Sequence, residues 1–260
     1  MNNVALITGA SSGIGAELAH IHAARGGDLV IVARREDKLD GLKTTLESNH
    51  NIEVIVIAKD LSQPGAAQAI YDEVKQADIN VQYLINNTGF GGRGKFYERD
   101  WDTDLAMINL NVVALTALTR LFLPNFVAHN SGKILNVSST ASLVPGPLQA
   151  VYYATKAYVT SFSNAIAEEL YDTNVTVTAL LPGATNTEFA STANLEATEL
   201  FSSAASARSV AAAGYEAMLA GKLNVIAGMS FMQRVVMALS PLLPKRMILK
   251  QIRQIQEVHG

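Results

Sequence analysis

The chain has 260 residues and a mass of 27.8 kDa, 49% of its residues are apolar, and its formal net charge is −3. This length fits one large α/β domain, and the nearly balanced charge gives no electrostatic reason to expect a nucleic-acid partner. The chain has no cysteine, which excludes disulfides and zinc–thiolate sites, and its five histidines are too scattered to suggest a metal site. We therefore expect neither a metal nor a nucleic acid.

The two ends of the chain give no sign of a membrane span. The N-terminus carries no basic segment followed by a long apolar run, so we expect no secretory signal and a cytoplasmic location. The apolar stretch Met229–Leu249 is interrupted by arginine, lysine and proline, so we expect no spanning helix there. The segment from about 229 to 260 mixes apolar with basic residues. We expect it to supply core or subunit-interface contacts, with contact to a membrane surface as the alternative.

Short β-rich segments alternate with longer helical patterns, which is typical of βαβ units and a parallel sheet. The segments expected to form strands are Val4–Thr8, Leu29–Ala33, Ile52–Ile57, Tyr83–Asn86, Lys133–Ser138, Val175–Leu181 and Leu223–Ile226. The segments expected to form helices are Gly15–Arg25, Glu36–Asn49, Pro64–Ala77, Trp101–Ala128, Ala150–Asp172 and Ser206–Ala220. Most strand segments are continuous apolar runs, as in a sheet with helices on both faces. Because no linker divides the chain, residues 1–260 are predicted to form a single domain.

A glycine-rich turn, with Gly9, Gly13 and Gly15, follows the first predicted strand and precedes the first helix. Without Cβ atoms, the backbone of such a turn can approach a pyrophosphate closely, and the helix start offers unpaired amides. The context indicates a dinucleotide site, although a tight turn that binds nothing also uses glycine. The remaining cofactor candidates in this turn are Ser11, Ser12 and Ile14.

The second predicted strand ends at Arg34 and Arg35, where an NAD-selective fold would offer a carboxylate to the ribose hydroxyls. Two guanidinium groups suit a 2′-phosphate instead, so NADP(H) is expected in preference to NAD(H). The alternative is a pair of solvated arginines at a helix entrance. Further candidates follow the third and fourth strands at the same sheet edge, namely Asp60, Leu61, Asn87 and Gly89. Asp60 could equally begin a turn.

Tyr152 and Lys156 lie four residues apart in a predicted helix, and Tyr152 lies thirteen residues after Ser139. Residues at this helical spacing share a face, so both side chains can point into one cleft. A neighbouring ammonium would lower the pKa of the phenol from about 10, which would suit proton transfer. Ser139, at a strand end, could donate a hydrogen bond to a substrate oxygen. The alternative is a packed aromatic ring beside a solvated lysine.

Together these motifs resemble the short-chain dehydrogenase/reductase family over nearly the full chain, from Val4 to about Met229. The matching segments are Thr8–Gly15, Asn86–Gly89, Leu110–Val112, Ser138–Ser139, Tyr152–Lys156 and Pro182–Thr187. The resemblance implies a Rossmann-type, doubly wound α/β fold with a seven-stranded parallel sheet. It also implies that a hydride and a proton are exchanged between a nicotinamide and a carbonyl or alcohol.

The resemblance implies individual roles. Tyr152 would be the general acid in reduction, Lys156 would lower its pKa and bind the nicotinamide ribose, and Ser139 would orient the carbonyl. Asn111, whose rival is Asn109, would hold a water that links Lys156 to solvent. The contacts to the nucleotide and the carboxamide would come from Asn87, Pro182, Gly183, Thr185 and Thr187. The chain departs from the family pattern at Thr88, usually alanine, and at Ser12, where some NADP-using members have a basic residue.

The sequence therefore predicts an NADP(H)-dependent oxidoreductase that reduces a ketone or aldehyde, or runs the reverse reaction. By the same resemblance, residues from about 184 to 205 would form a substrate lid. The lid has no fixed cation, which favours a moderately apolar substrate. We expect a homodimer or homotetramer. The alternative function is a catalytically inactive NADP-binding regulatory or scaffold protein.

Overall fold

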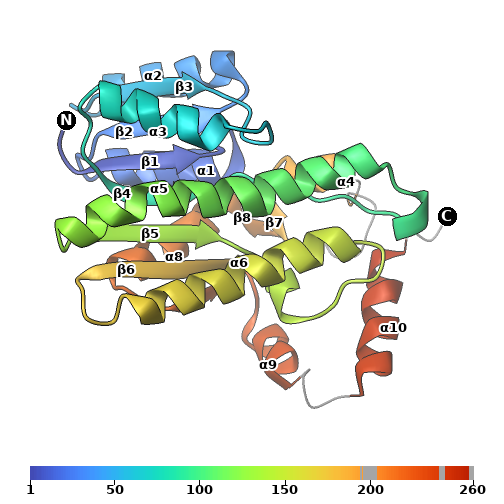
Figure 1. The fold of residues 1–260 in the computed structure, drawn as a ribbon. Helices are drawn as coiled ribbons and strands as arrows, with labels where there is room; N and C mark the ends of the chain where they lie inside the picture. Colours follow the sequence, from blue (N-terminus) through green and yellow to red (C-terminus); the bar gives the residue numbers. More distant parts are fainter. Residues whose placement is uncertain (194, 196–203, 240–243, 258–260) are drawn as a thin grey trace.

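The computed structural model describes residues 1–193, 195, 204–239 and 244–257. Seven parallel strands form one sheet in the order β3–β2–β1–β4–β5–β6–β9 (Figure 1). Their bounds are β1 Val4–Thr8, β2 Leu29–Ala33, β3 Val54–Ala58, β4 Val81–Asn86, β5 Gly132–Val137, β6 Val175–Pro182 and β9 Asn224–Ala227. The predicted seven-stranded, doubly wound fold is thus confirmed. The strand order reverses at β1, which lies between β2 and β4, and such a switch point opens a crevice at the carboxyl ends of the strands.

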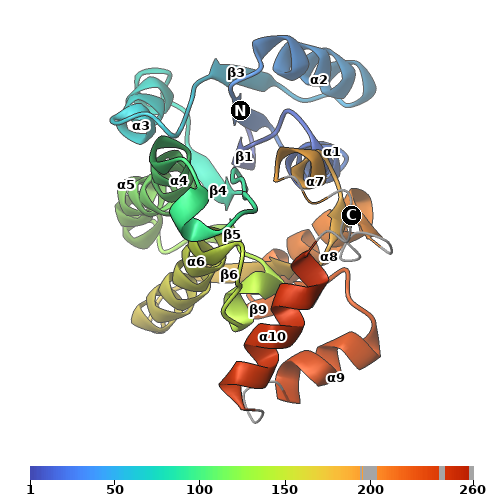
Figure 2. The ribbon, with the colours of Figure 1, turned by 90° about the vertical axis from the view of Figure 1, so that its right-hand side faces the viewer.

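Helices cover both faces of the sheet (Figure 2). One face carries α1 (Gly13–Ala23), α2 (Glu36–Asn49) and α8 (Ala207–Leu219). The other carries α3 (Ala66–Gln76), α5 (Leu115–Ala128) and α6 (Ala150–Glu169). The sheet is therefore buried from both sides, which is why the strands are continuous apolar runs.

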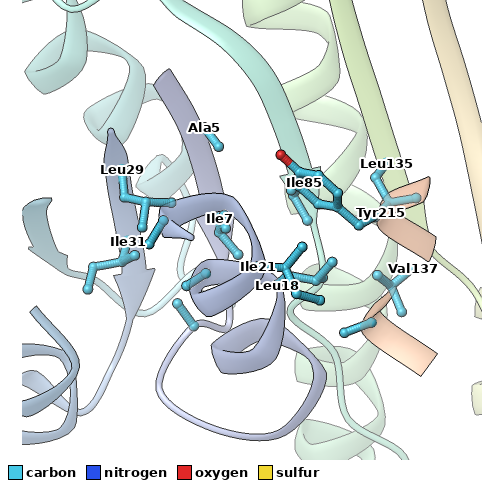
Figure 3. Packing of buried hydrophobic residues seen from close by; sticks show 14 of the residues in the cluster. Ala5, Ile7, Leu18, Ile21, Leu29, Ile31, Ile85, Leu135, Val137 and Tyr215 are labelled. Atoms are coloured by element: carbon cyan, nitrogen blue, oxygen red, sulfur yellow. The ribbon is translucent and has the colours of Figure 1, made fainter. Parts of the chain in front are cut away.

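The core splits into two layers because successive side chains of a strand point to opposite faces. In β1, Ala5 and Ile7 belong to the cluster under α1 and α8, whereas Val4 and Leu6 belong to the cluster under α3 and α5. Figure 3 shows the first layer, with side chains of α1 packed over β1 and β2 beside Tyr215 of α8. The alternation holds the strands, and hence their carboxyl ends, in fixed register.

The helix predicted over Trp101–Ala128 is one helical run that contains an unpredicted π-helical turn. It comprises α4 (Trp101–Ile108), the π-turn η2 (Asn109–Ala114) and α5. By length and composition alone, this run is the one helix among the described residues that could cross a membrane. Here its side chains Leu118, Phe122 and Phe126 are buried in the core against the sheet.

Several short elements carry no clear sequence signal. They are η1 (Phe96–Glu98), η3 (Thr140–Leu143), α7 (Phe189–Thr192) and the paired strands β7 (Thr185–Asn186) and β8 (Ala205–Ser206). α7 and β7 lie in the segment predicted to be a lid, of which residues 194 and 196–203 lie outside the described part.

The apolar and basic tail forms two helices, α9 (Phe231–Leu239) and α10 (Lys245–Gln256). Both lie at the end of the molecule opposite α2 and β3 (Figures 1 and 2). The last residue of α10, Gln256, is buried and reaches the body of the protein. Its amide nitrogen donates to Tyr153 Oη at 2.8 Å, and its amide oxygen accepts from Gln149 Nε2 at 3.1 Å. The tail is therefore tied to the start of α6.

Candidate active site

A cleft of about 420 Å³ opens at the carboxyl edge of the sheet. It is lined by eighteen of the twenty residues that the sequence singles out, from the glycine turn at one end to Ser139, Tyr152 and Lys156 at the other. The two exceptions are Gly15, which lies against Gly9, and Asn111, which lies against Gly89. Residues spread over the whole sequence are thus brought to one place.

The glycine turn has the backbone that a phosphate site requires. Gly9 and Gly13 have φ angles of +69° and +56°, a region that side chains disfavour. A Cβ at Gly15 would collide with the carbonyl oxygen of Gly9, so Gly15 keeps α1 close to β1. Asn87 fastens the turn, since its Nδ2 donates to the carbonyl oxygen of Thr8 at 2.9 Å. The side chain of Ser12, the N-cap of α1, accepts no hydrogen bond from the helix amides, which leaves them for an anion.

The residues around this turn fit NADP(H). Arg34 and Arg35 both line the cleft beside the turn, where they can meet an acidic group. Thr88 lines the cleft, and its hydroxyl is buried with no hydrogen-bond partner among the described residues. A polar cofactor atom could satisfy it. Asp60 lines the cleft and also begins a turn, with its Oδ1 accepting from the amide of Ser62 at 2.9 Å, so both interpretations of Asp60 are compatible.

Tyr152 and Lys156 meet at the other end of the cleft. Both side chains project from α6 and are buried, and Lys156 Nζ lies 5.9 Å from the centroid of the Tyr152 ring. Lys156 Nζ donates to the carbonyl oxygen of Val137, the last residue of β5, at 2.8 Å. Ser139, two residues further on, lies close enough to Tyr152 for its hydroxyl to influence the phenol, while its Oγ donates to the carbonyl oxygen of Pro182 at 3.4 Å. The predicted trio therefore converges, and the alternative of a solvated lysine is wrong.

The expected lowering of the Tyr152 pKa by Lys156 is not found. Burial raises the pKa of Tyr152 above its usual value, and the nearby hydroxyl of Ser139 offsets only part of this rise. Burial also lowers the pKa of Lys156 to about 8. The physical reason is that both groups are removed from water, which disfavours the charged form of each. This part of the sequence-based expectation is wrong for the structure as it stands.

Asn111 lies in the π-turn and is buried behind Gly89. Its Nδ2 donates to the carbonyl oxygen of Phe90 at 3.0 Å and to Thr155 Oγ1 at 3.1 Å. A Cβ at Gly89 would lie 3.0 Å from Asn111 Oδ1 and 3.3 Å from Lys156 Nζ, so glycine at position 89 leaves room for both side chains. Asn109 instead lines a separate hollow between α3 and the 101–128 run. The structure thus favours Asn111 over its rival.

Sequence reasoning missed several residues of the cleft. Glu188 contacts Arg35, with Nη2 and Oε2 2.8 Å apart, and the hydrogen bond from Arg35 lowers the pKa of Glu188. Phe189 was not missed, since the sequence predicts it as an apolar contact of the lid, and it packs on Tyr152 with ring centroids 5.3 Å apart. Gln149 lines the same end of the cleft, and its Oε1 is buried without a partner among the described residues. Gln149 lies three residues before Tyr152, a helical spacing that could have suggested it, whereas no local signal pairs residues 35 and 188.

The family model described as short chain dehydrogenase matches residues 3–198. The chain belongs to this family. A solved short-chain dehydrogenase from Sphingobium yanoikuyae, in complex with NADPH, is 32% identical and superposes with a TM-score of 0.83 over 98% of both chains. The family and the fold predicted from the motifs are confirmed.

Two curated relatives of this short-chain dehydrogenase are similar in sequence. The very-long-chain 3-oxoacyl-CoA reductase of Bos taurus is 35% identical over 68% of this chain, and the match spans 58% of that relative's length. The NADP-dependent 3-hydroxy acid dehydrogenase of Schizosaccharomyces pombe is 33% identical over 71% of this chain and 72% of its own. The 3-oxoacyl-CoA reductase is thus matched over little more than half of its length.

The buried lysine gives a prediction about stability. The pKa of Lys156 in the folded protein, about 8, lies below the 10.5 of a free lysine, so the unfolded chain binds this proton more tightly. The resulting cost to stability is present in full below pH 8 and disappears as the pH rises towards 10.5. We expect Lys156→Met to raise the free energy of unfolding by about 2 kcal/mol near neutral pH, after loss of the bond to Val137 is subtracted.

Urea unfolding of wild type and variant at about pH 7 and about pH 9.5 measures this difference, which should shrink at the higher pH. Lys222→Met, at an exposed position, is the matched control and should change stability by no more than about 0.5 kcal/mol. A Lys156→Met protein no more stable than wild type near neutral pH would contradict the argument.

Proposed function

We propose that this short-chain dehydrogenase is an NADP(H)-dependent oxidoreductase that reduces a ketone or aldehyde to an alcohol, or catalyses the reverse. The observation that carries the proposal is the convergence of Tyr152, Ser139 and Lys156 at one end of the cleft, with the glycine turn and the two arginines at the other. When bound, the nicotinamide supplies or accepts the hydride at the carbonyl carbon.

The chain's own residues supply the proton. Tyr152 Oη, protonated because burial raises its pKa, would donate its proton to the carbonyl oxygen as the alcohol forms. Ser139 would donate a hydrogen bond to the same oxygen, in place of its long contact with the carbonyl oxygen of Pro182 at 3.4 Å. Lys156, whose pKa of about 8 lies near neutrality, can return a proton towards Tyr152 and bind the ribose through its ammonium. Asn111, which lies beside Gly89 as Lys156 does, would hold the water that completes this path.

The substrate end of the cleft supports a moderately apolar carbonyl compound. Phe90, Phe189 and Leu195 line it, and the first two pack in the same small cluster as Tyr152. Phe189 and Leu195 belong to the segment 184–205, which supports the proposal that this segment is the substrate lid. The relatives named for 3-oxoacyl and 3-hydroxy acid substrates make acyl compounds oxidised at the third carbon the first candidates to assay.

The role of Tyr152 is tested by Tyr152→Phe, which removes one oxygen and keeps the ring. We expect turnover to fall at least about 1000-fold because the proton donor is lost, with the Kd for NADPH unchanged within about two-fold. The measurement is nicotinamide absorbance over a panel of carbonyl compounds, together with calorimetric cofactor binding.

Tyr153→Phe is the matched control. Its hydroxyl accepts from Gln256, and removing it should leave most of the activity because the second bond of Gln256, from Gln149, still holds the start of α6. Equal activity of Tyr152→Phe and wild type would rule out the assigned role. Cofactor binding by the wild type without turnover of any carbonyl would instead identify the catalytically inactive binding protein.

The preference for NADP(H) is tested by Arg34→Ala combined with Arg35→Ala. A charged, bidentate contact to a 2′-phosphate contributes about 1.5–3 kcal/mol, so the Kd for NADPH should rise about 10- to 100-fold. The Kd for NADH should change much less because its 2′-hydroxyl carries no charge. Equal losses for both cofactors would defeat the assignment of the two arginines.

We propose further that the protein is a homodimer or homotetramer. The 101–128 run and α6 expose a group of large apolar side chains, namely Leu105, Val113, Val127 and Tyr158, which are 38%, 53%, 41% and 39% exposed. Val113→Glu should dissociate the assembly because it would bury a carboxylate in the contact. Light scattering of the full chain measures the mass. Val236→Glu on α9, at a similarly exposed valine, tests the apolar and basic tail as the interface instead: if only this variant dissociates, the contact lies on the tail and not on the 101–128 run.

A further inference from the structure

The guanidinium of Arg35 holds a carboxylate from the far end of the sequence. Arg35 Nη1 donates to Glu188 Oε1 at 3.2 Å, and Nη2 donates to Glu188 Oε2 at 2.8 Å. The contact is bidentate, the geometry in which arginine binds carboxylates and phosphates. Glu188 directly precedes α7, so this contact joins the end of β2 to the segment proposed as the lid.

Two hydroxyls of the glycine turn complete the same site. Arg35 Nη2 also donates to Ser11 Oγ at 3.1 Å and to Ser12 Oγ at 3.0 Å. Ser12 Oγ donates to Glu188 Oε2 at 3.0 Å. One guanidinium and one hydroxyl therefore converge on the carboxylate, and all four residues line the cleft. This is a formed anion site, and Glu188 fills it.

We propose that the Glu188 carboxylate occupies the place of the cofactor's 2′-phosphate, so that NADP(H) must displace it whereas NAD(H) need not. This inference rests on the proposed use of Arg35 for the 2′-phosphate. Glu188 is then a specificity-determining residue that lowers the discrimination between the two cofactors. Both groups present anionic oxygens to the same donors, and they cannot share them without like-charge repulsion.

The 2′-phosphate can replace Glu188 because the ion pair between Arg35 and Glu188 is weak. The side chains of Arg35 and Glu188 are 41% and 58% exposed, and ion pairs this exposed stabilise a protein only slightly. A phosphate monoester carries nearly two charges at neutral pH and three acceptor oxygens, so it competes well for the guanidinium. The neutral 2′-hydroxyl of NAD(H) does not compete, and its binding is indifferent to where Glu188 lies.

The test isolates the 2′-phosphate by using two small ligands with the full chain. Adenosine 2′,5′-bisphosphate carries this group and adenosine 5′-monophosphate lacks it. In Glu188→Gln, calorimetry should show the Kd of the bisphosphate falling about 3- to 10-fold and that of the monophosphate changing less than about two-fold. Glu216→Gln is the control, since it removes the same charge from an exposed ion pair, with Arg25, outside the cleft. It should change neither Kd.

Unchanged or weaker binding of the bisphosphate to Glu188→Gln would overturn the inference. Weaker binding of the monophosphate would also overturn it, because Glu188 would then be a ribose ligand. The variant Arg35→Ala shows whether only the role of Glu188 is wrong or whether the proposed 2′-phosphate site is wrong as well. If Arg35→Ala weakens the bisphosphate selectively while Glu188→Gln has no effect, only the role of Glu188 is lost. If Arg35→Ala is not selective, the 2′-phosphate site itself is refuted, and the inference with it.

Discussion

The site depends on the buried ammonium group of Lys156, which has no carboxylate partner among the described residues. Lys156 is 5% exposed, and the hydrogen bond that the structure gives its Nζ goes to the uncharged carbonyl of Val137. A carboxylate partner would have stabilised the charge, but it would also have fixed the proton on the lysine. Burial alone brings the pKa of Lys156 near neutrality and keeps the proton on Tyr152, so once Tyr152 has donated its proton, the ammonium of Lys156 can readily return one to it.

The fold places this pair by joining one helix to one strand end. α6 packs against β5 and β6, and its four-residue spacing turns Tyr152 and Lys156 to the same side. β5 ends at Val137, whose carbonyl receives the lysine, and Ser139 follows two residues later. A shift of α6 along the sheet would move Lys156 away from Val137 and Tyr152 away from Ser139 at the same time. The tie from Gln256 of α10 to Tyr153 and Gln149 holds the start of α6 against such a shift.

The local sequence pattern was sufficient to predict the sheet, the glycine turn and the Tyr152–Lys156 pair, because each depends on residues close in sequence or on alternating burial. It did not predict features that depend on contacts between distant parts of the chain. The direction of the Tyr152 pKa shift follows from the burial of the side chain, which a four-residue spacing in the sequence does not predict. The π-turn that carries Asn111 has the same composition as the helix around it. The contact of Arg35 with Glu188 joins residues 153 positions apart, and only the folded chain brings them together.

The two ends of the cleft are connected through a single short segment. Glu188 contacts Arg35 at the end proposed for the 2′-phosphate, and the next residue, Phe189, packs on Tyr152 at the reactive end. A Cβ at Gly91 would collide with the Phe189 ring and crowd that of Tyr152, so the ring of Phe189 has little room in this arrangement. Displacement of Glu188 would therefore act on the wall beside Tyr152. Under the proposed function, Glu188 would lie beside the cofactor's 2′-phosphate and Phe189 beside the substrate's carbonyl. Because the two residues are adjacent in the chain, binding of NADP(H) would change the shape of the substrate end of the cleft.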